Sequence, residues 1–296
     1  MVVLSTHIVP DGVEEIRLYD YVQQIFPLIP SRKGVKKAIS REEIIVNGQK
    51  TTTGLWIKSG QKIELLESSV NPPKEYRLKL EVVYEDEYLA IINKPAGILV
   101  SGNQFRTIQN ALIGNIKLSK EEDALKWPKP VHRLDSSTSG LLIIAKTASA
   151  LVKLGKQFEK KEIEKKYCAI VIGKIPEIGI IDFEIEGLKS FTDYKLNCVI
   201  PSLRNEHLSL VELFPKTGRT HQLRIHLSKL GFPILGDKLY GSEGEILKGK
   251  GLFLSAVKLQ FSHPITDESL NLKIEAPYKF NALLERENRR WEKYNT

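Results

Sequence analysis

The sequence predicts an α+β protein built on a mixed, largely antiparallel sheet flanked by helices, with a small α+β module at the N-terminus. Segments with a strand pattern outnumber helices that could serve as crossovers, and most connections between them are short. The chain has 296 residues, of which 42% are hydrophobic, enough for two domains with separate cores. We therefore place a module at residues 1–70, a linker at 71–79 and a larger domain at 80–296.

The composition narrows the class of partner. Lys and Arg total 44 and Asp and Glu total 36, so the formal net charge is +8. This balance suits a polyanionic partner, although an ordinary basic protein would show it too. Cys168 and Cys198 lie in apolar, strand-like segments outside any CxxC or Cys/His cluster, so we expect buried, reduced thiols. No signal peptide and no run of about 18 apolar residues is present, which predicts a cytoplasmic protein without a membrane partner.

The N-terminal module is predicted to hold two helices and a small sheet. Apolar residues have helical spacing over residues 18–26, and Pro27 ends that helix. Ser31 is typical of an N-cap for a second helix over residues 32–39. The turn Asn47-Gly48 is a strong hairpin signal. The expected strands of the module are 44–46 and 62–66.

The second predicted helix of the module has a cationic face. Four side chains on it are related by three and four residues, so they point the same way: Arg32, Lys33, Lys36 and Lys37. Such a stripe suits contacts with phosphates. A solvated helix face would show the same pattern, so the stripe alone does not distinguish a phosphate-binding face from a solvated one.

The larger domain alternates strand and helix patterns. Strands are expected at 80–84, 88–92, 140–145, 165–174, 180–186, 193–200, 207–214, 251–261 and 269–275. Helices are expected at 107–116, 148–163, 220–230 and 278–294. In helix 220–230, Leu223, Leu227 and Leu230 should face inward, and Thr220 can act as the cap. Residues 119–130, which are charged and end in two prolines, are predicted to form a mobile surface loop.

The most informative stretch is VHRLDSSTSGLLIIAK at residues 131–146, where a polar turn leads directly into an apolar strand. It places Asp135 just before a buried strand, where partial shielding from water strengthens the electrostatic interactions of a carboxylate. Arg133 and the hydroxyls of residues 136–139 could hold Asp135 ionised and oriented, as a nucleophile or general base requires. An ordinary turn, in which such side chains bond backbone amides, has the same composition.

A second polar cluster is KTGRTHQLRIH at residues 216–226. Arg219 lies beside the predicted helix N-terminus, where backbone amides favour anions. Arg224 follows His221 by three residues, on the same side of the helix, and could pair with a buried carboxylate from elsewhere. His221 and His226 are five residues apart and point in different directions, which disfavours a zinc site.

Tyr167 follows Lys165 and Lys166 on a predicted strand. It is either an ordinary core or edge tyrosine or a stacking platform for a base. Other catalytic templates are missing from the sequence: there is no GxSxG elbow, no P-loop and no GxGxxG after a strand. A glycosidase would need a second well-placed acid, and none stands out.

Four motifs occur in order along the larger domain: INKPAG at 92–97, VHRLDSSTSGLLIIAK at 131–146, KKYCAIVIGK at 165–174, and TGRTHQLRIHLSKLGFPILGDKLYG at 217–241. Together they resemble the RluA-type pseudouridine synthases over roughly residues 80–280. In the module, the order SRKGVKKAI…IIVNGQK…IKSGQKIEL is similar to the RNA-binding alpha-L motif first seen in a ribosomal small-subunit protein. The segment SREEIIVNG departs from the glycine-containing turn usual there.

The resemblance implies an enzyme that isomerises a uridine within RNA without a metal or an organic cofactor. The bond from ribose carbon 1 to the ring nitrogen breaks, the uracil turns, and it rejoins through carbon 5. By position, Asp135 matches the catalytic aspartate, Arg224 the arginine that pairs with it, and Tyr167 the tyrosine that stacks on the target base and assists proton transfer. Implied substrate-binding residues are Arg133, which fills the gap left by the flipped base, His132 beside the aspartate, Leu223 on the other side of the base, Arg219 and His221.

The resemblance also implies the partner and the setting. Family members with the N-terminal module lean toward ribosomal RNA, so we expect large-subunit ribosomal RNA, with transfer RNA as the alternative. We expect a cytoplasmic monomer whose module binds RNA through its four cations. Two other functions stay open: a catalytically inactive RNA-binding ribosome-assembly factor, and a nucleoside hydrolase, which would need a second acid or a metal site.

Overall fold

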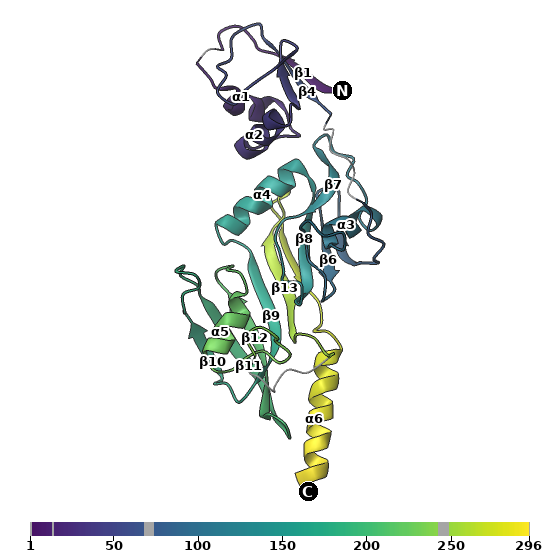
Figure 1. Cartoon of the computed structure of the whole chain (residues 1–296), viewed down its shortest axis with the longest axis vertical. Coiled ribbons are helices and arrows are strands. Elements are labelled where there is room, and N and C mark those ends of the chain that lie inside the picture. Colours follow the sequence, from purple (N-terminus) through teal and green to yellow (C-terminus); the bar gives the residue numbers. More distant parts are fainter. Residues whose placement is uncertain (1, 14, 68–73, 242–248, 296) are drawn as a thin grey trace.

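The computed structural model describes residues 2–13, 15–67, 74–241 and 249–295. Within these ranges the strands form two separate sheets, one of four strands and one of ten. Figure 1 shows the small sheet and its two helices at one end of the molecule and the C-terminal helix at the other. The predicted α+β class is confirmed, and the large sheet is mixed and mostly antiparallel.

The small sheet is antiparallel and runs in the order β1-β4-β2-β3. Its strands are β1 (Val3–Ile8), β2 (Ile44–Val46), β3 (Gln49–Lys50) and β4 (Lys62–Leu66). A core of its own joins the sheet to α1 (Leu18–Ile25) and α2 (Arg32–Ser40). The predicted cap of α2 is confirmed, because Oγ of Ser31 accepts a hydrogen bond from the N–H of Gly34 at 3.1 Å.

Strand β1 is absent from the sequence prediction. Its apolar residues Val3, Leu4 and Ile8 are all exposed on an edge strand, so the alternation of buried and exposed positions is weak. The predicted linker at 71–79 begins outside the described residues, since 71–73 are not among them. Residues 74–79 form neither helix nor strand, and the N–H of Tyr76 donates to the carbonyl of Asn110 at 3.1 Å.

The large sheet runs in the order β10-β11-β12-β9-β13-β8-β6-β5, with β14 paired to β13 and β7 paired to β8. All described pairs are antiparallel except β8 with β13. The strands are β5 (Glu81–Glu85), β6 (Leu89–Lys94), β7 (Ala124–Pro130), β8 (Ser139–Thr147), β9 (Glu164–Ile172), β10 (Ile178–Ile181), β11 (Thr192–Ser202), β12 (Glu206–Pro215), β13 (Leu254–Ser262) and β14 (Ser269–Lys273).

The short parallel contact between β8 and β13 depends on Gly140. Its φ is +111°, and a Cβ there would lie 2.2 Å from the carbonyl oxygen of Ala256, so only glycine lets the two backbones approach. Ala256 is in register with Gly140 on one side and with Tyr167 of β9 on the other. The turn that precedes β8 is therefore held beside Tyr167.

Helices cover parts of the large sheet (Figure 1). They are α3 (Ile108–Ala111) with the 3-10 turn η1 (Leu112–Gly114), α4 (Ala148–Glu159), α5 (Gln222–Lys229) and α6 (Lys279–Asn295). As predicted, α5 buries Leu223 and Leu227, and both join the core formed by β9 and β12. None of the described helices combines the length and the apolar character that a membrane span needs.

Four local predictions are wrong. The strand expected at 180–186 is β10, which ends at Ile181. Part of the predicted loop 119–130 is strand β7, whose prolines are tolerated because its pairing with β8 is interrupted by an irregularity. Helix α5 starts at Gln222, with His221 rather than Thr220 at the N-cap. Cys198 is exposed, since a register shift in β11 next to it changes the side that it faces.

Candidate active site

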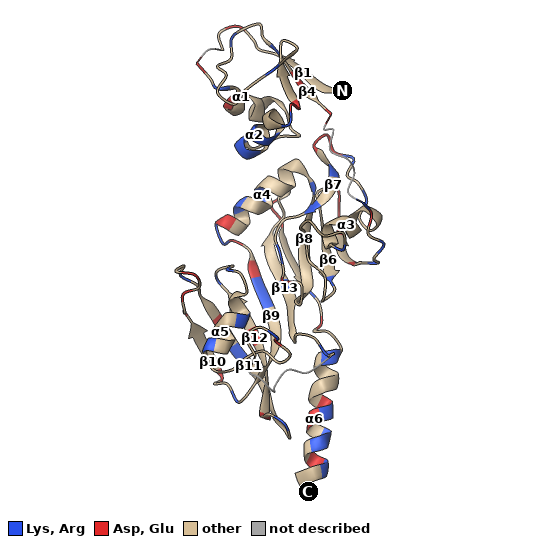
Figure 2. Ribbon diagram, viewed as in Figure 1, with Lys and Arg blue, Asp and Glu red and all other residues tan. Residues whose placement is uncertain are grey.

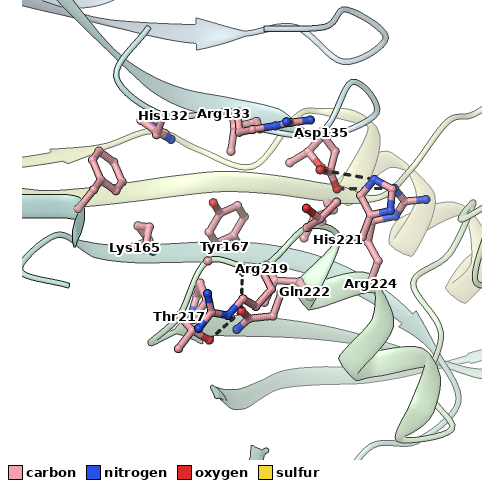
Figure 3. Close-up of a pocket in the computed structure, with 18 of the residues that line it drawn as sticks. His132, Arg133, Asp135, Lys165, Tyr167, Thr217, Arg219, His221, Gln222 and Arg224 are labelled. Atoms are coloured by element: carbon pink, nitrogen blue, oxygen red, sulfur yellow. Dashed lines mark hydrogen bonds and ion pairs between the residues drawn. The ribbon is translucent and has the colours of Figure 1, made fainter. Parts of the chain in front are cut away.

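A cavity of about 300 Å³ opens where the turn before β8, strand β9 and the start of α5 meet. Figure 3 shows side chains from these three segments converging on it. The structure brings together all eight residues that the sequence analysis placed in the catalytic and substrate-binding sets: Asp135, Tyr167, Arg224, Arg133, His132, Leu223, Arg219 and His221. The four cations of α2 belong to the separate small module.

The carboxylate of Asp135 faces α5 from the turn that precedes β8. The N–H of Thr138 donates to the backbone carbonyl of Asp135 at 3.1 Å and closes this turn. The Asp135 side chain is 20% exposed; Nη1 of Arg224 lies 3.6 Å from its Oδ2, and Nε2 of His221 lies 3.7 Å from its Oδ1. Asp135 is thus an accessible carboxylate with positive charge nearby and no tight ion pair.

The groups expected to orient Asp135 are not the ones that do so. Among the described residues, neither Arg133 nor the hydroxyls of residues 136–139 form an ion pair or hydrogen bond with its carboxylate. Arg133 is exposed, and the hydroxyl of Ser139 donates to that of Ser255 at 3.1 Å. The turn directs the carboxylate toward α5, so its partners come from a segment almost ninety residues later in the chain.

Arg224 is held mainly by a second carboxylate, Asp237. Its Nε and Nη2 donate to the two oxygens of Asp237, both at 2.7 Å, in a bidentate pair. The Asp237 side chain is 1% exposed and also accepts the N–H groups of Leu239 and Tyr240. Burial alone would raise the pKa of Asp237, but the bonds from Arg224 and these amides outweigh it and lower the pKa. The buried carboxylate expected as a partner for Arg224 is therefore Asp237.

Tyr240 connects the two groups that flank Asp135. Its hydroxyl is hydrogen-bonded to Nδ1 of His221 at 2.9 Å, and the guanidinium of Arg224 lies 5.1 Å from its ring centroid. His221 has a left-handed backbone with φ of 54° at the N-cap of α5. Asp237 and Tyr240 belong to the motif GDKLYG, and the sequence predicted no role for either of them.

Lys94, from the INKPAG motif, is a third residue for which the sequence predicted no role. It is fully buried, and its ammonium donates to the carbonyls of Pro95, Ser136 and Thr138 at 3.0, 3.1 and 2.7 Å. Burial lowers the pKa of Lys94 to about 8, and the charge of Asp135 opposes that shift. Lys94 thus holds the backbone of the Asp135 turn through hydrogen bonds to its carbonyls and adds positive charge near the carboxylate.

Uncharged rings form part of the cavity lining. Burial, together with the charge of Asp135, raises the pKa of Tyr167, so its phenol stays neutral. Burial, with help from the Lys165 ammonium, lowers the pKa of His132 to about 3. Nε2 of His132 accepts the N–H of Ile143 at 3.0 Å, and its ring lies 4.7 Å from that of Phe158. The cavity therefore offers apolar and aromatic surface beside the carboxylate of Asp135.

Comparisons with known proteins agree with this geometry. Residues 88–229 match the RNA pseudouridylate synthase family. The chain is 34% identical over 303 residues to the ribosomal large subunit pseudouridine synthase C of Rickettsia felis, covering 89% of this chain and 94% of that protein. It is 35% identical over 268 residues to an uncharacterized RNA pseudouridine synthase of Bacillus subtilis, covering 84% and 85%.

A solved structure gives the same result for the fold. The human RNA pseudouridylate synthase domain containing 1 has a TM-score of 0.57 and 26% identity, and the match covers 67% of this chain and 84% of that one. The sequence relatives exceed 30% identity over most of the chain. The chain therefore belongs to the RluA-type family of RNA pseudouridine synthases, isomerases that convert uridine in RNA to pseudouridine.

Proposed function

We propose that this protein isomerises a uridine of large-subunit ribosomal RNA and that Asp135 performs the central step. The choice of RNA is supported by the name of the Rickettsia felis relative, a ribosomal large subunit enzyme. The observation that carries the role of Asp135 is its partly exposed carboxylate, which lines the same cavity as Tyr167 and has Arg224 at 3.6 Å.

Asp135 acts as the nucleophile or as the general base. In the reaction the bond from ribose carbon 1 to N1 breaks and a bond from ribose carbon 1 to C5 forms. C5 then loses its proton, and N1 gains one, so the atoms balance. The positive charge of Arg224 lies 3.6 Å from the carboxylate of Asp135, and the neutral phenol of Tyr167 is available for proton transfer beside it.

The cavity suits a flipped uracil. Its volume of about 300 Å³ is at the small end of ligand sites. The target base has to leave its stack to reach Asp135. Leu223 and Tyr167 both line the cavity, so the uracil lies between an aliphatic and an aromatic surface, which let it turn more freely than fixed hydrogen bonds would. Exposed Arg133 takes the place that the base leaves in the RNA.

Two further lining residues support the substrate. Arg219 is exposed at the rim of the cavity, where its guanidinium meets a phosphate of the RNA. His132 stays neutral and contributes its ring to the wall, while His221 helps to hold the ribose side of the nucleotide near Asp135. No step in this scheme requires a metal or an organic cofactor.

We further propose that residues 1–70 form an RNA-binding module. The side chains of Arg32, Lys33, Lys36 and Lys37 are exposed on α2, while Val35, Ala38 and Ile39 on its other face are buried. Figure 2 shows the blue of Lys and Arg along this helix. We propose that a monomer acts in the cytoplasm, where ribosomes are.

The test is a map of pseudouridines in ribosomal and transfer RNA from cells with and without the gene. We expect one or a few sites in large-subunit ribosomal RNA to disappear in the deletion strain. Complementation with Asp135→Asn should fail to restore them while the purified variant still binds RNA. Sites lost only from transfer RNA would refute the choice of RNA, and restored sites would remove Asp135 from its role.

A further inference from the structure

A second cavity of about 670 Å³ adjoins the active site. It lies between the end of α4, the start of β9 and the end of β12. Six residues line both cavities, so the two share a wall: Phe158, Lys165, Pro215, Thr217, Gly218 and Arg219. The active-site cavity accommodates the target base, and the second cavity is more than twice as large.

The charge of this second cavity favours an anion. Four cations and two carboxylates line it, namely Lys161, Lys165, Lys216 and Arg219 against Glu159 and Glu164. Among them, Lys216 is paired with Asp193 at 3.4 Å. A phosphate is the anion that an RNA strand would bring next to the active site.

Lys165 is the cation best placed to receive that phosphate. It is half-buried on β9, two residues before Tyr167 and on the same side of the strand (Figure 3). Within the described chain its ammonium has no ion pair and no hydrogen bond to another side chain or carbonyl. Burial lowers the pKa of Lys165, in line with an ammonium that has no anionic partner nearby. An incoming phosphate would supply the missing partner.

The same cavity offers aromatic surface for a base. Phe158 and Phe214 both line it, and both are half-buried, so part of each ring remains open to the cavity. Phe158 also contacts the ring of His132 in the active-site wall. Base–aromatic stacking tolerates any base, because every base has a π face. The cavity therefore combines a place for a phosphate with a place for a base.

We propose that the second cavity is a subsite for the nucleotide next to the target uridine in the RNA strand. Its base packs against Phe158 and Phe214, and its phosphate lies between Lys165 and Arg219, at the wall shared with the active site. This inference rests on the proposed function, since it takes the first cavity as the site of the flipped uridine. The subsite binds the RNA strand beside the target uridine, and this binding does not depend on the RNA sequence.

The test compares two oligomers that differ only in their bases. One is a ten-residue oligouridylate, and the other has the same length with every second residue abasic, so the phosphates are kept. Phe214→Leu in the full-length protein should weaken binding of the first about tenfold, the effect of one lost stack, and leave binding of the second unchanged. Phe214→Tyr retains an aromatic face and should bind both like the wild type, which also controls for folding.

Lys165→Met should weaken both oligomers and lower the salt dependence of binding by about 0.7 in slope, the value for one single-strand phosphate contact. Lys273→Met is the matched control, because Lys273 is exposed on β14 and lines neither cavity. Equal losses for Phe214→Leu on the two oligomers, no loss on either, or an unchanged salt slope for Lys165→Met would overturn the subsite.

Failure of the subsite and failure of the proposed function give different results. Nucleoside analysis of ribosomal RNA treated with the wild-type enzyme reports the function. The expected binding pattern without any pseudouridine formed would support the subsite and refute the function. Pseudouridine formed by an enzyme whose binding ignores Phe214 and the missing bases would refute the subsite and support the function.

Discussion

Replacing Asp237 with asparagine removes the negative charge that holds Arg224 and leaves nearly the same shape. In the native protein, Arg224 donates to both oxygens of Asp237 at 2.7 Å and lies 3.6 Å from Asp135. An asparagine has one oxygen, so one of the two bonds is lost, and the remaining one runs from the charged guanidinium to a neutral oxygen. We expect the guanidinium to move toward Asp135, the other carboxylate within its reach.

The size of the effect follows from the distances. With an effective dielectric constant of about 20, closing the Arg224–Asp135 pair from 3.6 to 2.7 Å stabilises the resting carboxylate by about 1.5 kcal/mol. If that stabilisation is lost when Asp135 attacks, kcat falls about tenfold. Losing a charged partner from a buried pair costs about 3–5 kcal/mol of stability. Because asparagine retains one of the two oxygens, we expect the stability loss of Asp237→Asn to lie near the lower end of that range.

Single-turnover formation of pseudouridine, followed by nucleoside mass spectrometry, reports the rate, and urea unfolding reports stability. Asp86→Asn is the matched control. Asp86 also accepts two backbone N–H groups, from Tyr88 and Leu89 at 2.7 and 2.8 Å, but lies outside the active-site cavity. The Asp86→Asn variant should lose stability and keep the kcat of the wild type. A native kcat for Asp237→Asn, together with lower stability, would show that Asp237 does not tune Asp135 and would refute the reasoning.

Three other predictions concern the cavity and the module. Tyr167→Phe keeps the ring but loses the phenol, so kcat should fall by about a hundredfold or more with RNA affinity unchanged; equal kcat in single-turnover assays would limit Tyr167 to stacking. The folded-state pKa of His132 is about 3, below its unfolded value, so stability is complete above pH 6.5 and falls by about 2–3 kcal/mol by pH 4.5; His132→Gln should lack that part of the loss, and identical acid unfolding curves would contradict it. Alanine at all four α2 cations should lower the salt slope of RNA binding by about 3, and an unchanged slope would count against the module.

Local signals predicted most of the secondary structure. Strands with strict alternation or strong apolar runs, such as Ile44–Val46 and Lys62–Leu66, have the predicted bounds. The errors occur where the local pattern competes with tertiary structure. The prolines of β7 suggested a loop, yet β8 offers it a partner, and β1 exposes its apolar residues because it lies at a sheet edge.

The sequence predicted which residues form the site but not which of them contact one another. Motif similarity named Asp135, Tyr167 and Arg224, and all three line one cavity. Sequence alone did not show that Arg224 is shared between two carboxylates, because Asp237 follows α5 in a loop whose position depends on the whole sheet. The cue lay in the motif GDKLYG, where an aspartate three residues before a tyrosine can accept that residue's own N–H.

The division of Arg224 between two carboxylates fits the role proposed for Asp135. In the proposed mechanism, a guanidinium bound tightly to Asp135 would occupy the lone pairs that the carboxylate needs for attack. Asp237 satisfies Arg224 in a buried bidentate pair, so the positive charge stays fixed at 3.6 Å from Asp135 without bonding to it. Lys94 acts in the same direction, since its ammonium is bonded to backbone carbonyls of the turn and influences Asp135 only through its charge. Both cations near Asp135 thus have their hydrogen bonds committed elsewhere, and the proposed mechanism uses the carboxylate oxygens that this leaves free.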